Sequence, residues 1–269
     1  MPKSNLGSER IPSGIVELDK MIGGGFPTGF FCSVQGDIGA GTTTFCTQVV
    51  WSRLVSGGIA AYVCLDETQE RIIEHFKNFG HDVQPYIDSS QFIIMDGHPF
   101  LRSLASASQL QYGDSKNKDL LNKLLDEFSN RMAVARMKNA SNKLPIVSVI
   151  DSYSSMAPYV DLRSMHVLAH IMANSARRHG TLLFAVCHGG SMEANIVSAC
   201  NSVADGMIRL ETNLARGVFK RFMRIEKMAF TSTPEVELEC VITSRQGMQI
   251  ISPPHTSTKK NREIGGLST

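Results

Sequence analysis

The sequence predicts an α/β protein in which a mostly parallel, twisted sheet is flanked by helices and continues into C-terminal β-hairpins. Three observations support this fold class: apolar strand-like runs alternate with helix-like stretches, the first of these runs leads into a glycine-rich loop, and the strand-like runs after Asp205 follow one another without helices between them. With 269 residues, 42% of them hydrophobic and 19% charged, the chain can bury the core of one large domain of this kind.

The strands expected in the parallel sheet are short and almost continuously apolar. In chain order they are FFCSVQG (30–36), IAAYVCLD (59–66), QFIIMD (91–96), PIVSVID (145–151) and TLLFAVCHGG (181–190). Strands of this composition are typical of a sheet that helices cover on both faces.

The segments between these strands carry the spacing of helices. Apolar residues recur three or four positions apart in 42–55 and in 118–138, and a further helix over 167–180 ends at a glycine. Another helix is expected over 68–80, with a threonine as its N-cap and a glycine as its stop. Residues 97–116 fit none of these patterns, so we expect a mobile loop there.

The last part of the chain reads as hairpins added at the edge of the sheet. The strand-like runs are GMIRLET (206–212), VFKRFMRIEKMAF (218–230), VELECVITS (236–244) and GMQIIS (247–252). We therefore expect an N-terminal segment of residues 1–9, one domain over residues 10–252, and a polar tail over residues 253–269 that is disordered.

The composition narrows the class of protein. The formal net charge of +2 argues neither for nor against a polyanionic partner. The N-terminus, MPKSNLGSER, lacks the apolar core of a signal peptide, and no apolar run approaches the length of about 20 residues that crosses a bilayer. The six cysteines occur singly and without zinc-site spacing. We expect an intracellular protein with no direct membrane insertion, whose cysteines are small buried hydrophobes in a reducing compartment.

A glycine-rich loop, GDIGAGTTT over residues 36–44, joins the first core strand to the first long helix. Its spacing fits the pattern G-x-x-x-x-G-K-S/T, in which backbone N–H groups at a helix N-terminus hold phosphate oxygens and the last hydroxyl ligates Mg²⁺. Thr43 supplies that hydroxyl, but Thr42 stands where the pattern has lysine. The loop predicts ATP and Mg²⁺ as ligands, held by Gly36, Asp37, Ile38, Gly39, Ala40, Gly41, Thr42, Thr43 and Thr44.

The strand over residues 145–151 ends in Asp151, next to the expected position of the loop. A carboxylate at the end of a neighbouring strand reaches the hydration shell of the magnesium ion in P-loop proteins. Asp151 and Thr43 are therefore the candidate metal residues, with waters completing the coordination. The alternative is that Asp151 is an ordinary loop or helix-capping aspartate.

Several segments resemble a KaiC-type domain of the RecA superfamily of P-loop proteins. The segment over residues 11–41 is similar to the G-x-x-x-L-D segment and the G-G-G-x-P-x-G turn that precede the first strand in that family, and the similarity continues through residues 62–97, 148–156 and 221–230. It implies a RecA-like nucleotide-binding domain over residues 10–252. Within that group, the single-domain length, the GD at the start of the loop and His188 resemble the FlaH (ArlH) family of archaeal motility accessory proteins.

The resemblance implies roles for residues outside the loop. In KaiC-type domains an acidic pair after the second core strand polarises the attacking water, and that pair here is Asp66 and Glu67, with Glu67 as the candidate general base. The alternative is that both acids merely favour the N-terminus of the next helix. His188 stands where relatives sense the γ-phosphate, although a histidine at a strand end is as often structural. Lys227 corresponds to the lysine of a K-x-R pair that reaches a neighbouring subunit's nucleotide, and Ala229 replaces its arginine.

Thr42 and Ala229 thus both remove a cation from the expected site. A hydrogen bond to a charged group contributes roughly 1.5–3 kcal/mol, so loss of the loop lysine should weaken binding about 10- to 150-fold. An arginine finger contributes about 10³–10⁵ in rate, so hydrolysis should be weak or absent unless another cation substitutes. We expect Lys227 of a neighbouring subunit in that role, and we interpret Lys220 and Arg221 as protective charges on an edge strand.

Together with the missing lysine, the resemblance implies an ATP-binding regulatory or scaffold subunit, an accessory component of an archaeal-type motility (archaellum) motor. It would act as a homo-oligomer, a hexameric ring in the cytoplasm at the periphery of a membrane-bound motor, with protein partners. The alternative is a slow KaiC-type ATPase or autokinase in signalling, for which Asp66, Glu67 and Asp151 are the evidence. No nucleic-acid partner is expected, because residues 189–206 hold no Lys, Arg or aromatic side chain for phosphate neutralisation or base stacking.

Overall fold

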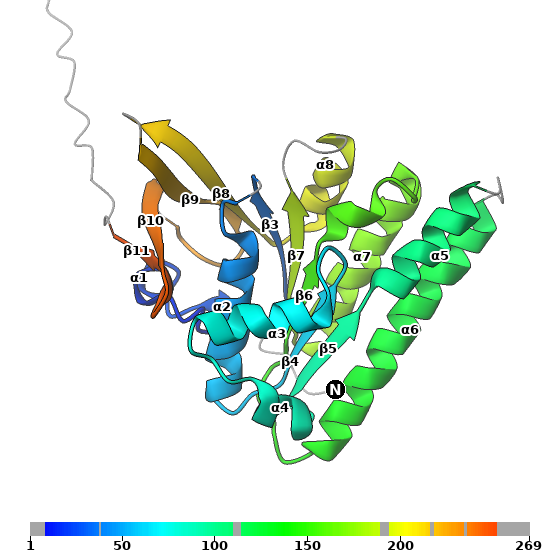
Figure 1. Ribbon diagram of the computed structural model, residues 1–269, viewed down its shortest axis with the longest axis horizontal. Coiled ribbons are helices and arrows are strands. Elements are labelled where there is room, and N and C mark those ends of the chain that lie inside the picture. The colour runs from blue at the N-terminus through cyan, green and yellow to red at the C-terminus, as the bar shows by residue number, and fades with distance from the viewer. Residues whose placement is uncertain are drawn as a thin grey trace, which may run out of the picture.

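A mixed sheet forms the centre of the computed structural model (Figure 1), which describes residues 9–37, 39–109, 114–188, 194–215, 218–233 and 236–251. Within these residues the sheet has nine strands in the order β11-β10-β9-β8-β3-β7-β6-β4-β5. Six strands pair in parallel: β3 (Phe30–Gly36), β4 (Ala60–Cys64), β5 (Phe92–Asp96), β6 (Val147–Asp151), β7 (Leu182–His188) and β8 (Gly206–Ala215). The antiparallel strands β9 (Val218–Met228), β10 (Glu237–Thr243) and β11 (Gly247–Ile250) extend one edge, and β1 (Arg10–Ile11) pairs with β2 (Phe26–Pro27) in a separate ribbon.

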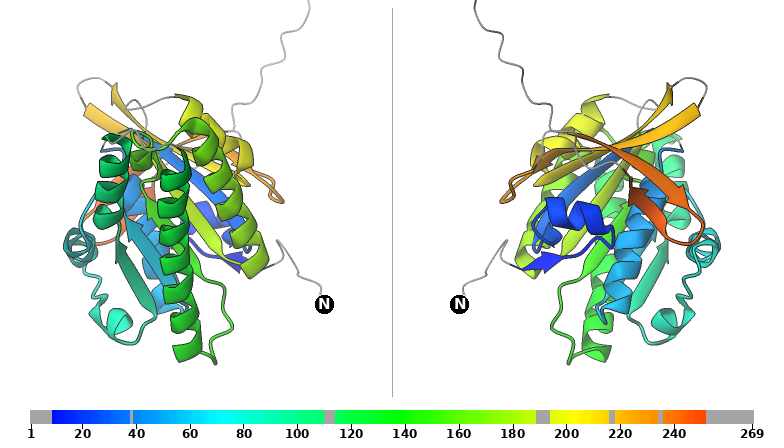
Figure 2. Two further views of the ribbon diagram at one scale, coloured as in Figure 1. Left: turned by 90° about the vertical axis from the view of Figure 1, so that its right-hand side faces the viewer. Right: turned by 90° about the vertical axis from the view of Figure 1, so that its left-hand side faces the viewer.

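Helices cover both faces of the sheet, as the two side views in Figure 2 show. The first layer contains α1 (Val16–Met21), α2 (Thr42–Val55), α3 (Gln69–Asn78) and α4 (Gln84–Asp88). The second contains α5 (His98–Gln109), α6 (Asp114–Lys138), the 3₁₀ turn η1 (Tyr153–Met156), α7 (Leu162–His179) and α8 (Ala194–Val203). The expected α/β class, with a mostly parallel sheet, flanking helices and C-terminal antiparallel strands, is confirmed.

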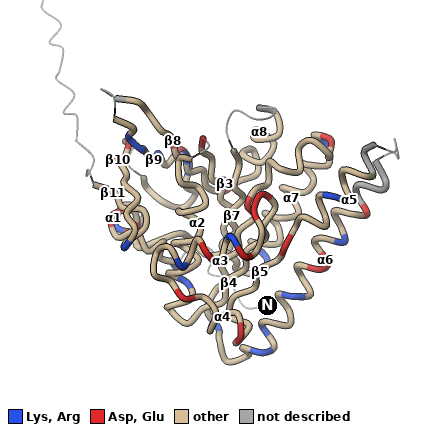
Figure 3. The backbone as a smooth tube through the Cα atoms, viewed as in Figure 1, with Lys and Arg blue, Asp and Glu red and all other residues tan. Residues whose placement is uncertain are grey.

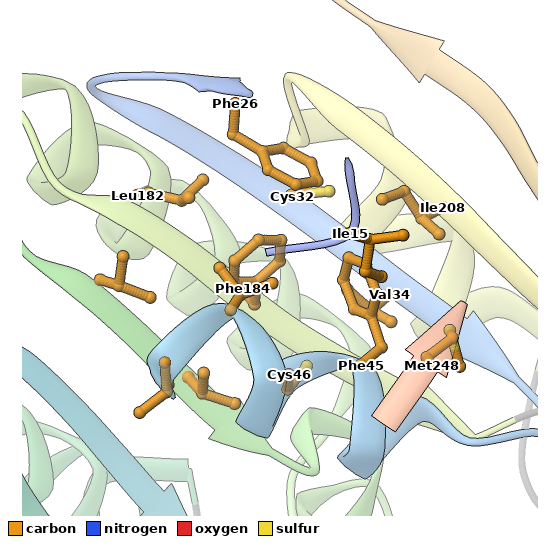
Figure 4. Packing of buried hydrophobic residues seen from close by; sticks show 14 of the residues in the cluster. Ile15, Phe26, Cys32, Val34, Phe45, Cys46, Leu182, Phe184, Ile208 and Met248 are labelled. Atoms are coloured by element: carbon orange, nitrogen blue, oxygen red, sulfur yellow. The ribbon is translucent and has the colours of Figure 1, made fainter. Parts of the chain in front are cut away.

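Alternation along each strand divides the core between the two layers. In β7, Phe184 packs toward α2, whereas Leu183 and Ala185 pack toward α7. Phe184 meets Phe26 and Phe45 edge to face, with ring centroids 5.1 and 5.8 Å apart, in the cluster drawn in Figure 4. These contacts hold α2 against β3 and β7, so the N-terminus of α2 lies at the carboxyl end of the sheet.

Strand register brings the ends of four core strands together at that edge. Gly36 pairs with His188 across β3 and β7, and Cys64 pairs with Asp151 across β4 and β6. The chain leaves β3 through α2 and returns to the sheet at β4, passing over β7 and β6. In an open α/β sheet, such a crevice at the carboxyl ends of the strands is where ligands bind.

The expected loop over residues 97–116 is wrong, because this part of the chain contains α5 and the start of α6. Leu104 of α5 is buried in the second layer of the core, and the partly buried Phe100 and Leu101 pack against the same cluster, so these long-range contacts hold the helix in place. Helix α8 likewise occupies the segment after β7, before the first of the late strands, and β8 joins the parallel part of the sheet instead of an edge hairpin. The predicted disordered tail, residues 253–269, and Ile38 of the loop lie outside the described residues.

The outer helices carry charges of both signs. Figure 3 shows both acidic and basic residues along α6, with basic residues at its C-terminal end, and Arg131 and Glu127 form an ion pair of 2.7 Å on the exposed side.

All six cysteines are buried and free, as predicted from their spacing. Among the helices that the structure describes, none is both long and apolar enough to cross a bilayer.

Candidate nucleotide site

The glycine-rich loop connects the end of β3 to the first turn of α2. Gly41 is the N-cap of α2 and has a left-handed backbone with φ of 102°, which favours glycine. A Cβ at this position would also lie 2.7 Å from Ile242 Cδ1, so no side chain fits there without a shift. The free N–H groups of the first turn of α2 therefore open toward the carboxyl edge of the sheet, where an anion is stabilised.

A hydrogen-bonded group formed by Thr43, Asp151 and Tyr62 lies directly beside this turn. Thr43 Oγ1 donates to Asp151 Oδ2 over 2.9 Å, and the Tyr62 hydroxyl donates to the same oxygen over 2.5 Å. Asp151 is only 4% exposed, and its Oδ1 has no hydrogen-bond partner among the residues that the structure describes. Burial raises the pKa of Asp151, although the hydrogen bonds from Tyr62 and Thr43 act in the opposite direction.

A second group at the same edge contains Asp66 and His188. His188 Nε2 lies 3.0 Å from Asp66 Oδ2 and 3.9 Å from Asp151 Oδ1, and the hydroxyl of Ser155 donates to the other oxygen of Asp66. The hydrogen bond to Asp66 raises the pKa of His188, while burial of the ring opposes that rise. The imidazole is thus held between two carboxylates from different strands.

Glu67, the candidate general base, also lines the cavity but is paired with the first turn of α3, the helix that follows it. Its Oε2 lies 2.6 Å from Arg71 Nε, one turn further along α3, and its side chain is 43% exposed. Asp66 rather than Glu67 makes the contact with His188. The acidic pair is therefore split between a strand-end network and a helix ion pair.

A cavity of about 400 Å³ lies between the loop and these strand ends. The structure brings together most of the residues that the sequence singled out, and adds two from the late strands. The lining residues are Gly39, Gly41, Thr42, Thr43, Thr44, Asp66, Glu67, Asp151, His188, Arg221 and Ile242.

Arg221 is in a different place from the one that we predicted. We interpreted it as an edge-strand charge, but its Nε donates to the carbonyl oxygen of Gly39 over 3.3 Å and its side chain lines the cavity. Neighbouring cations on β9 are neutralised elsewhere: Lys220 pairs with Glu239 at 2.8 Å and Arg224 pairs with Glu211 at 2.6 Å. No carboxylate of the described chain pairs with Arg221, so its charge is available to an anion in the loop.

Lys227 does not reach the cavity of its own chain. It lies near the opposite end of β9, at the level of Met207, and its Nζ donates to the carbonyl oxygen of Ala204 over 2.5 Å. Ala229, at the other position of the expected pair, donates its backbone N–H to Asp205. A role for Lys227 in a neighbouring subunit stays a prediction.

Sequence reasoning missed Tyr62 and Ser155. Tyr62 is the single hydroxyl-bearing residue in an otherwise apolar strand, and a buried tyrosine hydroxyl requires a partner. That requirement, together with the strand-end carboxylate of Asp151, was a usable signal. Ser155 gave no such signal, because the turn after β6 holds several serines and only the fold shows which one faces Asp66.

The side chains at this edge fit a magnesium ion that arrives with a nucleotide. Mg²⁺ prefers oxygen ligands and retains several waters, and the buried Oδ1 of Asp151 is an oxygen ligand without another partner in the described chain. The hydroxyl of Thr43 lies beside it, at the start of the helix whose N–H groups face the cavity. The loop lysine is the component that the site lacks.

Comparison with known proteins agrees with this geometry. A family model described as the KaiC ATPase matches residues 11–255. A UPF0273 protein of Pyrococcus horikoshii is 26% identical over 84% of this chain and 87% of its own, one of Thermotoga maritima is 22% identical over 83% and 88%, and the circadian clock protein KaiC3 of Synechocystis is 25% identical over 91% of this chain and 46% of its own. The crystal structure of a KaiC-like protein from Pyrococcus horikoshii has the same fold, with a TM-score of 0.72 and 21% identity over 91% of this chain and 99% of that chain. The chain belongs to the KaiC ATPase family.

Proposed function

We propose that this protein binds ATP with Mg²⁺ and acts as a nucleotide-dependent regulatory or scaffold subunit with weak or no hydrolysis. The observation that carries the proposal is the group of Thr43, Asp151 and Tyr62, which keeps a hydroxyl and a carboxylate in place at the start of α2 although Thr42 replaces the loop lysine. A site that had lost its ligand would have no need of a buried carboxylate with one oxygen unpaired among the described residues.

Different groups of the chain would bind the phosphates and the metal ion. The backbone from Gly39 to Thr44 would hold phosphate oxygens, and Thr43 with Asp151 would hold the metal through a hydroxyl and through water. Bound Mg²⁺ neutralises charge on the phosphates. Arg221 would supply the cation that Thr42 cannot, from β9 of the same chain.

The contacts of the acidic pair support weak hydrolysis. Asp66 accepts hydrogen bonds from His188 and Ser155, and one oxygen of Glu67 is paired with Arg71, so these contacts compete with a water molecule for both carboxylates. The second candidate function is a slow KaiC-type ATPase or autokinase. The presence of both acids in the lining of the cavity favours it.

The proposed setting is a ring. Resemblance to the FlaH family supports a hexameric accessory component of an archaeal-type motility motor, located in the cytoplasm beside a membrane-bound complex. Lys227 on β9 would reach the nucleotide of the next subunit. These finer assignments rest on the resemblance, whereas the binding of a nucleotide rests on the geometry of the cavity.

Calorimetric titration with ATP, with and without Mg²⁺, tests the binding proposal. Wild-type protein should bind ATP more tightly with Mg²⁺, and Asp151→Asn should abolish that difference while unfolding as cooperatively as wild type. The matched control is Asp96→Asn, which changes a carboxylate at the end of β5, two strands away from β6 and outside the cavity. Equal metal dependence in Asp151→Asn would show that this carboxylate is not a metal residue, and phosphate release that Glu67→Gln abolishes would favour the ATPase alternative.

A further inference from the structure

Three side chains with metal-ligating atoms meet on the floor of the cavity, each at the end of a different strand. Ligand atoms of Asp66, Asp151 and His188 all lie within 4.8 Å of one another. His188 Nε2 is 3.0 Å from Asp66 Oδ2 and 3.9 Å from Asp151 Oδ1. We infer that these three residues bind a divalent first-row transition ion in the absence of nucleotide.

The free oxygen of Asp151 is the strongest indication of a ligand. Hydrogen bonds from Thr43 and Tyr62 fix its Oδ2, so the direction of Oδ1 is set by the fold rather than by solvent. The side chain is only 5% exposed, and Oδ1 is unpaired among the residues that the structure covers. A buried carboxylate oxygen without a partner is costly, and a cation between it and His188 would remove that cost.

The identity of the donor atoms selects the kind of ion. Mg²⁺ and Ca²⁺ take oxygen ligands, whereas an imidazole nitrogen with two carboxylates suits Mn²⁺, Co²⁺, Ni²⁺ or Zn²⁺. Metal bonds of about 2.0–2.2 Å place neighbouring ligand atoms about 3.0–3.5 Å apart. His188 and Asp66 already have that spacing, whereas Asp151 Oδ1 must move closer to the ring by about 0.5 Å, and the ligand atoms of Asp66 and Asp151, which lie within 4.8 Å of each other, must also approach each other.

This ion is distinct from the Mg²⁺ that would enter with ATP. The magnesium assignment uses the hydroxyl of Thr43 and reaches Asp151 through water, whereas the transition ion uses His188 and Asp66 and requires no phosphate. Both use Asp151, so the two ligands should compete. Metal-loaded protein should therefore bind Mg-ATP more weakly than metal-free protein. The inference itself does not depend on nucleotide binding, because it is tested with the metal alone.

The experiment is a titration of chelator-treated protein with Co²⁺ in the absence of nucleotide, followed by visible absorption and calorimetry. One Co²⁺ per chain should bind with ligand-field absorption, and His188→Asn should weaken that binding by about tenfold or more. The matched control is His98→Asn, because His98 Nδ1 also lies 2.9 Å from a carboxylate, that of Asp96, but no third metal-ligating side chain of the described residues joins this pair. Binding to the control should equal binding to wild type.

The same titration distinguishes the proposed site from a second possible Co²⁺ site on the surface. The Nε2 atoms of His166 and His170 lie 2.9 Å apart on one exposed side of α7, so this pair is another place where Co²⁺ could bind. His170→Asn should leave the predicted binding unchanged. Loss of the Co²⁺ signal in His170→Asn but not in His188→Asn would overturn the inference.

Asp66→Asn is the second variant, because Asp66 is partly exposed and its replacement by a similar polar side chain leaves the core intact. It should weaken Co²⁺ binding as His188→Asn does, with an unchanged melting temperature. Absence of Co²⁺ binding to wild type, or binding that neither variant weakens, would show that no such site exists. Either result is independent of whether the protein binds Mg-ATP, so failure of this inference and failure of the proposed function remain distinguishable.

Discussion

Arg221 and Thr42 approach the same loop from two elements, one from β9 and the other from the first turn of α2. If Arg221 replaces the missing lysine, Arg221→Gln should weaken Mg-ATP binding by about tenfold or more, because a hydrogen bond to a charged group contributes about 1.5–3 kcal/mol. The matched control is Lys220→Gln, which removes the adjacent charge that pairs with Glu239. Calorimetry should show a loss for the first variant only, and equal losses would reduce Arg221 to a general electrostatic contribution.

Thr42→Lys tests the same compensation from the other side. The threonine is buried against Gly36, at the position from which a lysine would extend into the cavity. The substitution should tighten ATP binding by about tenfold or more. Its gain should be larger in the Arg221→Gln background than in wild type, because two cations that serve one anion are not additive. Equal gains in both backgrounds, measured as a double-mutant cycle by calorimetry, would mean that the two side chains act independently.

The residues at strand ends could be predicted from the sequence, and those that depend on side-chain direction could not. Asp151 and Thr43 were expected to meet because carboxyl ends of parallel strands and the helix that follows share one edge. Their contact of 2.9 Å agrees with that expectation. Arg221 was misassigned because its direction depends on the pairing register of β9 with β8 and β10, and a shift of one residue would turn it to the other face.

Among the helices, α7 has an N-cap whose contribution to stability depends on pH. Asp161 is its N-cap and accepts a hydrogen bond from the backbone N–H of Ser164 over 3.0 Å. Burial tends to raise the pKa of Asp161, but the hydrogen bonds with Ser164 outweigh it and hold the pKa below the usual range. The stabilisation is therefore present above the ordinary aspartate pKa, about 3.9, and is lost as pH falls through the lower pKa of the folded state.

Asp161→Ala should lower the free energy of unfolding by about 1 kcal/mol at neutral pH, because it removes the cap. Asp161→Asn is the matched control, since asparagine caps equally well without a titrating group. Urea unfolding across pH 7 to 3 should show the deficit of the alanine variant shrinking as the wild-type carboxylate is protonated, while the difference between the asparagine and alanine variants stays constant. A deficit that does not change with pH would mean that the carboxylate's charge contributes nothing to the cap.

Elements with a strong local pattern were predicted, and those held by long-range contacts were not. The core strands and α2, α3 and α7 follow from continuous apolar runs and from helical spacing. Helix α5 was read as a loop, because the apolar residues of its sequence, HPFLRSLASASQ, that reach the second layer of the core lie in its first half, at Phe100, Leu101 and Leu104, and polar or small residues follow them. Tertiary packing outweighs weak local preference in such a segment.

For the whole molecule, the fold class could be predicted because the same pattern, an apolar strand-like run followed by a helix-like stretch, recurs along the chain. Each buried strand ends near the same edge, and the structure brings Asp66, Asp151 and His188 together there, although the sequence assigned Asp66 and His188 through the resemblance and Asp151 through its place at a strand end. The order of the strands and the parallel pairing of β8 with β3 could not be inferred in the same way, since both depend on which chain crossing packs best against the other layer. Association between chains likewise depends on which surfaces pack together, so the sequence pattern alone does not determine it.

Binding of nucleotide and association of chains into a ring should be coupled. A ligand that contacts two subunits binds the assembled ring better than the single chain, so it must shift the equilibrium toward assembly by that difference in affinity. Mg-ATP should therefore promote oligomers. Lys227→Ala should weaken both ATP affinity and ATP-driven assembly, because Lys227 is an exposed residue whose amine, bonded among the described residues only to the carbonyl oxygen of Ala204, could turn to a neighbour's phosphates. The matched control is Lys77→Ala, an exposed lysine near the end of α3.

Mass photometry across an ATP series, with thermal unfolding of each variant, decides between two roles of Lys227. If it contacts the neighbour's nucleotide, the Lys227→Ala variant should melt at the wild-type temperature yet need more ATP to assemble, and Lys77→Ala should match wild type in both respects. If Lys227 only caps the end of β8 through Ala204, the variant should melt at a lower temperature and assemble with the same ATP dependence as wild type. That second result would remove the physical link between occupancy of the cavity and formation of a ring, and binding of ATP would then be an event within one chain.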